Sequence, residues 1–221
     1  MKKYLLKSFE YLQDHEYLLL IYFTLFTLIL YPFLEWHYNG ALRYHVLLSL
    51  ILLAGVSSTG DRWQLIWSTV VVGLLSFGLS WADYVLESEK WLLLLYLIVT
   101  LIFFVLVLTK VLFSIFGHTK VNKHLIFGSI AGYLMIGMAG AFAFAIIELS
   151  YPGSFAPAVT TIGNIPSFLY YSFVSMLTIG YWDMVPVGGQ AQMRSVLFAI
   201  AGQLYLTIIV WVLIGKYVRD K

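Results

Sequence analysis

The chain has 221 residues, of which 61% are hydrophobic and 11% are charged, and its formal net charge is +2. Soluble domains are about half apolar and about a quarter charged, so this composition excludes an ordinary soluble fold and indicates membrane lipid as the surroundings. The small net charge gives no indication of a nucleic-acid partner, and the lack of cysteine excludes disulfides, thiolate metal sites and cysteine nucleophiles.

Residues 1–16 combine lysines and acidic residues with one apolar side, which predicts an interfacial helix or, alternatively, a disordered tail. Apolar segments follow along the rest of the chain, and five of the six are near the roughly 20 residues that a helix needs to cross the hydrocarbon. The second is short. They are Tyr17–Leu34, Tyr44–Ser57, Leu65–Ala82, Trp91–Thr109, Leu125–Ile147 and Ser195–Gly215. We therefore predict an all-α membrane protein with six transmembrane helices.

The distribution of lysine and arginine supports an even number of spans. If the N-terminus lies in the cytoplasm, ten basic residues lie inside and three lie outside. This asymmetry is what the positive-inside rule expects. We therefore expect an integral protein of the cell membrane with both termini in the cytoplasm.

A basic and polar break at Phe116–His124 divides the spans into two groups. The sequence predicts an N-terminal segment (1–16), a four-helix domain (17–123) and a second unit of two spans that enclose a loop (124–221). The fourth span carries no charged residue from Trp91 to Thr109. Because charges that move through the membrane field supply the energy of voltage gating, we expect little voltage dependence.

The loop between the last two spans contains a short apolar stretch, Ser167–Leu177, which is too short to cross the membrane but suits a re-entrant helix. Pro166 fits the first helical turn, where no amide hydrogen is needed. The C-terminal end of such a helix favours a cation, and the backbone that follows, Thr178 to Trp182, is tolerated at membrane depth only if it is buried or lines a water-filled path. Carbonyls along such a path are ion ligands, so the spacing predicts a cation pathway.

The stretch "SMLTIGYWD" resembles the filter T-[VI]-G-Y-G-D of the tetrameric potassium-channel superfamily. Its context is similar too: Tyr170 and Tyr171 stand where that family often has two tryptophans, Pro186 follows the filter, and "AGQLYLTIIV" resembles the inner helix. The close resemblance covers roughly residues 145–215. The plan of the whole chain resembles the six-transmembrane, voltage-gated-like bacterial members, with a voltage-sensor-like domain that lacks the sensor arginines.

The resemblance implies a homotetramer, because one loop cannot encircle an ion. It implies no cofactor and no enzymatic activity, with potassium as the permeant ion. The residues that would line the selectivity filter are Thr178, Ile179, Gly180, Tyr181, Trp182 and Asp183, with potassium bound by the backbone from Thr178 to Tyr181. Those that would support the filter are Tyr170, Tyr171 and Glu148, with Asp183 bonded to one of the two tyrosine hydroxyls and Glu148 bracing the outer pore. Gly202 would be the hinge of the inner helix.

Trp182 departs from the family pattern, which has a glycine with positive φ at that position. A left-handed conformation costs a non-glycine residue roughly 1–2 kcal/mol, which burial of the aromatic ring could offset. We therefore expect the outer filter to depart from the family geometry while the sites from Thr178 to Gly180 persist. Two alternatives follow from this residue: a cation channel with relaxed selectivity, and a channel-like subunit that four Trp182 rings block. The sequence has no G-x-S-x-G and no His-Glu-x-x-His motif, which argues against an enzyme.

Overall fold

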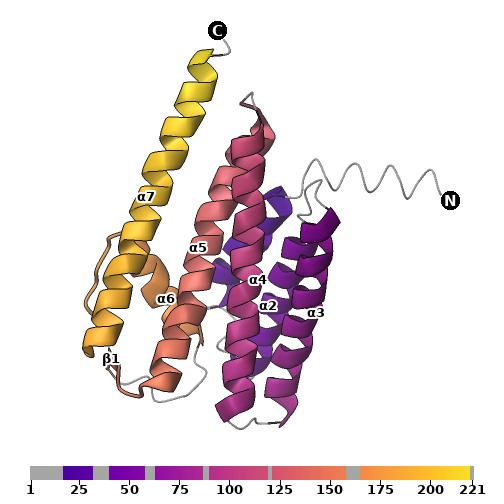
Figure 1. The fold of residues 1–221 in the computed structure, drawn as a ribbon. Coiled ribbons are helices and arrows are strands. Elements are labelled where there is room, and N and C mark those ends of the chain that lie inside the picture. The colour runs from indigo at the N-terminus through magenta and orange to yellow at the C-terminus, as the bar shows by residue number, and fades with distance from the viewer. Residues whose placement is uncertain are drawn as a thin grey trace, which may run out of the picture.

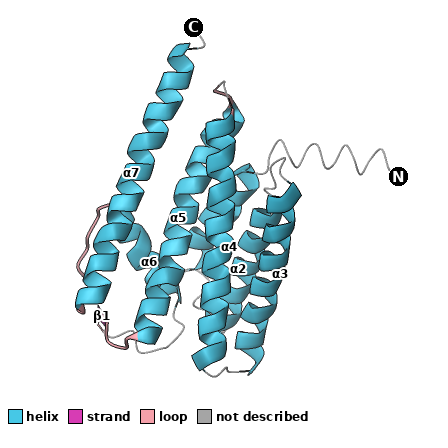
Figure 2. Ribbon diagram, viewed as in Figure 1, coloured by secondary structure: helices cyan, strands magenta, loops and turns pink. Residues whose placement is uncertain are grey.

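The computed structural model describes residues 17–31, 40–57, 63–86, 90–118, 121–157 and 165–219. The predicted N-terminal segment 1–16 and the outer end of the first predicted span lie outside these residues. Regular structure in the described part is almost entirely helical (Figure 2). The prediction of an all-α protein is therefore confirmed.

The helices follow the predicted apolar segments, and most of them extend beyond those segments. They are the helix Tyr17–Tyr31, α2 (Gly40–Ser57), α3 (Trp63–Leu86), α4 (Lys90–Gly117), α5 (Lys123–Ser150), α6 (Ile165–Met176) and α7 (Gly189–Arg219). Two strands of two residues each, β1 (Phe155–Ala156) and β2 (Val185–Pro186), pair antiparallel.

Within the described residues, four helices are long and apolar enough to cross a membrane: α3, α4, α5 and α7. The helix Tyr17–Tyr31 and the described part of α2 are apolar but shorter. The structure thus contains four long candidate spans, and the predicted number of six remains a prediction.

The long helices run roughly parallel to one another, and α4 lies between α3 and α5 (Figure 1). α5 in turn contacts both α6 and α7, so it is the element that joins the four-helix part to the rest. Glycines of α5 permit close approach: a Cβ at Gly137 would collide with Phe173 of α6, and one at Gly140 with Phe198 of α7. The hydroxyl of Ser172 in α6 donates to the Gly137 carbonyl at 2.7 Å, which fixes α6 against α5.

Polar side chains buried among helices α2, α3 and α4 are paired with one another. The Tyr44 and Tyr96 hydroxyls lie 3.0 Å apart, and His45 Nδ1 lies 2.6 Å from the Ser80 hydroxyl. A buried polar group must find a partner inside the protein when no water can solvate it. These two pairs therefore satisfy the hydroxyl groups of Tyr44, Tyr96 and Ser80 and one ring nitrogen of His45 inside the protein.

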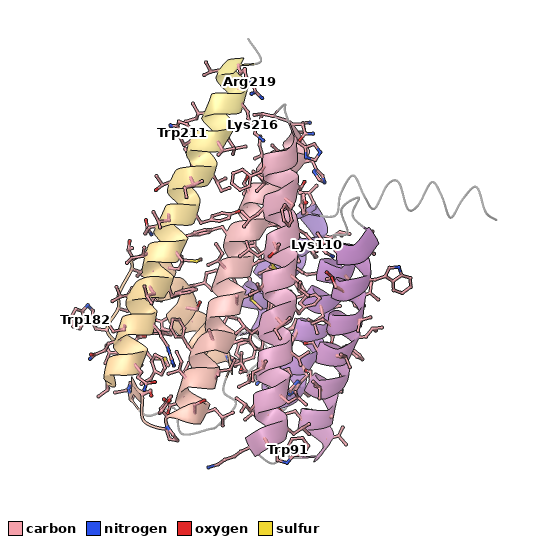
Figure 3. The ribbon with its side chains drawn as sticks, in the orientation of Figure 1. Trp91, Lys110, Trp182, Trp211, Lys216 and Arg219 are labelled. Atoms are coloured by element: carbon pink, nitrogen blue, oxygen red, sulfur yellow. The ribbon has the colours of Figure 1, made fainter. Side chains whose placement is uncertain are left out.

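One side chain joins the C-terminal ends of α4 and α7. Lys216 of α7 donates from Nζ to the carbonyl oxygens of Ile115 and His118, at the end of α4. Figure 3 shows Lys216 on the side of α7 that faces the neighbouring helices, whereas Trp211 points the other way. Because the last carbonyls of a helix lack intrahelical partners, the lysine supplies donors that α4 cannot provide itself.

Candidate functional site: the loop after α6

α6 has 12 residues and begins at Ile165, so Pro166 lies in its first turn as the sequence predicts. The helix ends in a Schellman motif, in which the Ile179 N–H donates to the Val174 carbonyl at 3.0 Å and the Thr178 N–H donates to the Ser175 carbonyl at 3.2 Å. Thr178 takes the left-handed position of this motif, with a φ of 57°. The motif turns the chain sharply out of the helix into the filter-like loop.

The loop alternates in backbone handedness. Thr178, Gly180 and Trp182 have φ values of 57°, 61° and 67°, whereas Ile179 and Tyr181 between them do not have positive φ. Left-handed backbone is natural for glycine, but it costs threonine or tryptophan roughly 1–2 kcal/mol. Such strain persists only where surrounding structure over-determines it, and it concentrates at functional sites. The sequence put this conformation in doubt at Trp182 and gave no sign of it at Thr178.

Trp182 has a φ of 67°, the positive value that the resemblance assigns to a glycine at this position. This angle therefore does not show the departure from the family geometry that we expect of the outer loop. The expected compensation by burial is also missing within one chain, because the side chain is 84% exposed. Figure 3 shows the Trp182 ring pointing away from the helices. Its Nε1 atom lies 3.8 Å from the position that a Cβ on Gly180 would occupy. The indole therefore lies near Gly180 in the loop and leaves most of its surface uncovered.

Tyr170 of α6 contacts the loop directly. Its hydroxyl donates to Asp183 Oδ2 at 2.6 Å, and its ring stacks on Tyr181 with the centroids 6.4 Å apart. The hydrogen bond to Asp183 raises the pKa of Tyr170 to about 12. The structure thus brings together Tyr170, Tyr181 and Asp183. The resemblance implied a bond between Asp183 and either Tyr170 or Tyr171, and in the structure Tyr170 makes it.

Tyr171 points away from the loop, since adjacent residues of a helix face different directions. Its hydroxyl donates to the Ser195 hydroxyl of α7 at 2.7 Å, and its ring packs edge-on against Phe144 of α5 at 4.9 Å. Tyr171 therefore fixes α6 to α5 and α7. The sequence grouped it with Tyr170, and it did not indicate Ser195 as a partner.

Glu148 near the end of α5 is bonded to the turn that follows it. Its Oε1 accepts from the Gly153 N–H at 2.7 Å, and its Oε2 accepts from the Phe155 N–H at 3.1 Å. Phe155 belongs to β1, which pairs with β2 directly after the filter-like loop, with Phe155 opposite Pro186. Glu148 is thereby connected to the far end of the loop through a two-strand ladder.

Gly202 lies where α7 crosses the end of α6. A Cβ at this glycine would lie 2.5 Å from Met176 Cγ, and α7 is continuous from Gly189 to Arg219 through this position. The close approach gives Gly202 a packing role, while the predicted hinge remains a prediction. The next residue, Gln203, donates from Nε2 to the Met176 carbonyl at 2.9 Å. The sequence did not indicate this contact, because a single glutamine in an apolar helix has no distinguishing pattern.

Comparison with known proteins matches residues 126–219 to a family model described as "Ion channel". The match extends from the first turn of α5 to the end of α7, so it includes α6 and the loop after it. No curated protein and no solved structure match the chain. The C-terminal region of this membrane protein is therefore similar to an ion channel domain.

Proposed function

We propose that the protein is a potassium-selective channel that conducts through the backbone of Thr178–Tyr181. One observation carries this proposal: a 12-residue helix, too short to cross the membrane, leads directly into a loop of alternating handedness between two long apolar helices. Backbone of this kind is tolerated at membrane depth only where protein buries it or where it lines a water-filled path.

The alternation of handedness supports a cation as the occupant of that path. Successive residues that alternate in this way turn their N–H groups to one side of the chain. The carbonyl groups are then left on the other side, where they can replace the hydration shell of a potassium ion. The C-terminal end of α6 adds a partial negative charge at the start of the loop. Both features favour cations over anions.

Assembly as a homotetramer is part of the proposal, since four loops are needed to surround an ion. Large apolar side chains of α7 are exposed in a single chain, and they include Leu197, Val210, Trp211 and Ile214. An apolar cavity of about 920 Å³ lies beside the loop, with Tyr170, Ile179 and Tyr181 in its wall. These surfaces are suited to contact with neighbouring subunits and lipid. In this arrangement both termini lie in the cytoplasm and residues 17–123 form the outer four-helix domain.

Trp182 supports a second candidate function. Its exposed ring stands at the end of the loop, where the family pattern has glycine. Four such rings around one axis would narrow the outer mouth, which favours a weakly selective or non-conducting subunit.

Ion flux through the purified protein in liposomes separates these functions. The proposed channel carries potassium at least about tenfold better than sodium, and Trp182→Gly leaves this flux in place. Equal flux of the two ions identifies the weakly selective channel. Flux that appears only in Trp182→Gly identifies the blocked subunit and contradicts the proposal.

A further inference from the structure

We propose that Gln203 is a positioning residue of the pore: its side-chain amide fixes the Met176 carbonyl and thereby the end of the filter loop that adjoins α6. The inference rests on the proposed function, because it assigns Gln203 a part in ion selection. Gln203 acts through the backbone of α6 and does not itself contact the permeant ion.

Among the last four carbonyls of α6, that of Met176 is the one that receives no backbone N–H from the Schellman motif. The three carbonyls before it each accept a backbone N–H: that of Phe173 from Leu177, that of Val174 from Ile179, and that of Ser175 from Thr178. A carbonyl at the end of a helix that lacks such a donor must bond to a side chain, water or ligand. The direction of the Met176 carbonyl therefore depends on groups outside α6.

Gln203 supplies the main donor. Its Nε2 lies 2.9 Å from the Met176 oxygen, whereas the Tyr133 hydroxyl lies 3.5 Å away, at the limit of a hydrogen bond. The adjacent Gly202 brings the backbone of α7 against the Met176 side chain, so α7 holds this residue at two points. With Nε2 bound to the carbonyl, the amide orientation of Gln203 is defined.

The position of Met176 matters because Thr178, two residues later, carries the first strained angle of the loop. A β-branched residue remains left-handed only while its surroundings hold it there. Without the Gln203 donor, the Met176 carbonyl can rotate toward another donor, and Thr178 can relax toward negative φ. The carbonyl spacing that distinguishes potassium from sodium would then be lost at this end of the loop.

Gln203→Leu tests the inference, because leucine keeps the apolar stem and removes the amide. Gln192→Leu is the matched control: in the same helix, the Gln192 amide donates to the Pro186 and Val187 carbonyls, both at 3.3 Å, beyond the far end of the loop. The potassium-to-sodium permeability ratio is measured from reversal potentials in bilayers. We expect Gln203→Leu to lower it roughly three- to tenfold, the range that one hydrogen bond represents, and Gln192→Leu to change it less than about twofold.

A second measurement reports on the bond itself. With isotope-labelled methionine carbonyls, the infrared band of Met176, assigned by its loss in Met176→Leu, should shift to higher frequency in Gln203→Leu and stay in place in Gln192→Leu. Thermal unfolding shows whether both variants are folded.

The outcomes separate the two proposals. A selective wild type whose permeability ratio is unchanged in Gln203→Leu overturns the role of Gln203 and leaves the proposed function intact. A Met176 band that does not move also overturns it, because the bond is then absent. A wild type that carries no potassium overturns the proposed function, and the role of Gln203 in ion selection with it.

Discussion

The Tyr170 hydroxyl donates a hydrogen bond to Asp183 with the two oxygen atoms 2.6 Å apart, which ties the middle of α6 to the residue directly after Trp182. The loop Thr178–Trp182 is therefore attached to α6 at both ends, by the Schellman motif and by this bond. A short loop that is fixed at both ends has few conformations left, which is how strained φ angles can be maintained.

The first prediction concerns the titration of Tyr170. Its pKa is raised to about 12 by the bond to Asp183, whereas an unperturbed tyrosine titrates near 10. A pKa raised in the folded state means that the contribution to stability is complete below pH 10 and is lost as the pH rises through about 12. The tyrosinate absorbance of the wild type minus that of Tyr170→Phe should appear near pH 12. In an Asp183→Asn background it should appear at lower pH, and a step near pH 10 in the wild type would contradict the bond.

The second prediction concerns backbone strain at Trp182. Trp182→Gly should stabilise each chain by about 0.5–1 kcal/mol, because the roughly 1–2 kcal/mol of left-handed strain exceeds the added entropy of the unfolded glycine. Trp182→Ala is the control, since it removes the ring but keeps the Cβ and its strain. Chemical denaturation in detergent measures all three proteins. If both variants lose stability equally, the ring itself packs in the assembly and strain is not the dominant effect.

The third prediction compares two glycines in long helices. A Cβ at Gly140 of α5 would collide with Phe198 and with the Ser172 hydroxyl, whereas a Cβ at Gly78 of α3 meets nothing within 4 Å. Gly140→Ala should therefore destabilise the protein by about 1–3 kcal/mol through overpacking. Gly78→Ala should stabilise it by up to about 1 kcal/mol through helix propensity. Thermal unfolding measures both, and equal shifts would show that α5 does not pack this closely.

The fourth prediction concerns voltage. α4 carries no charged side chain between Lys90 and Lys110, and a charge that crosses the full membrane field supplies about 2.3 kcal/mol per 100 mV. The open probability should therefore be nearly constant across the physiological range of potential. Single-channel recording over that range tests this, with a voltage-gated channel in the same bilayers as the control. A steep curve equivalent to several moving charges would require a voltage sensor elsewhere in the chain.

Hydropathy and turn residues predicted the helices well, because the length of an apolar segment is a local property of the sequence. The short helix predicted over Ser167–Leu177 is α6, and Pro166 does lie in its first turn. The two shortest apolar helices show the limit of this reasoning, since apolar character alone does not establish that a helix crosses the membrane.

The details of the candidate site depended on contacts between distant residues and could not be predicted in the same way. The two adjacent tyrosines look equivalent in the sequence, but helical geometry directs Tyr170 to Asp183 and Tyr171 to Ser195. The left-handed angle of Thr178 arises from the Schellman motif that ends α6, and a threonine in the sequence does not indicate such an angle. Gln203 acquires its partner only because α7 crosses the end of α6.

The contact of Lys216 with the end of α4 joins the last helix back to the start of the segment that contains α5, α6 and α7. From α4 the chain continues through α5, α6, the loop Thr178–Trp182 and α7, and Lys216 then donates back to the carbonyls of Ile115 and His118. Without this contact, α7 would be held by its packing on α5 and α6, and the end of α4 would not be tied to it. With this contact, a displacement of α7 must also move another connected element, and the loop Thr178–Trp182 is one of them. The end of α4 and the loop Thr178–Trp182 are therefore coupled to each other through α7.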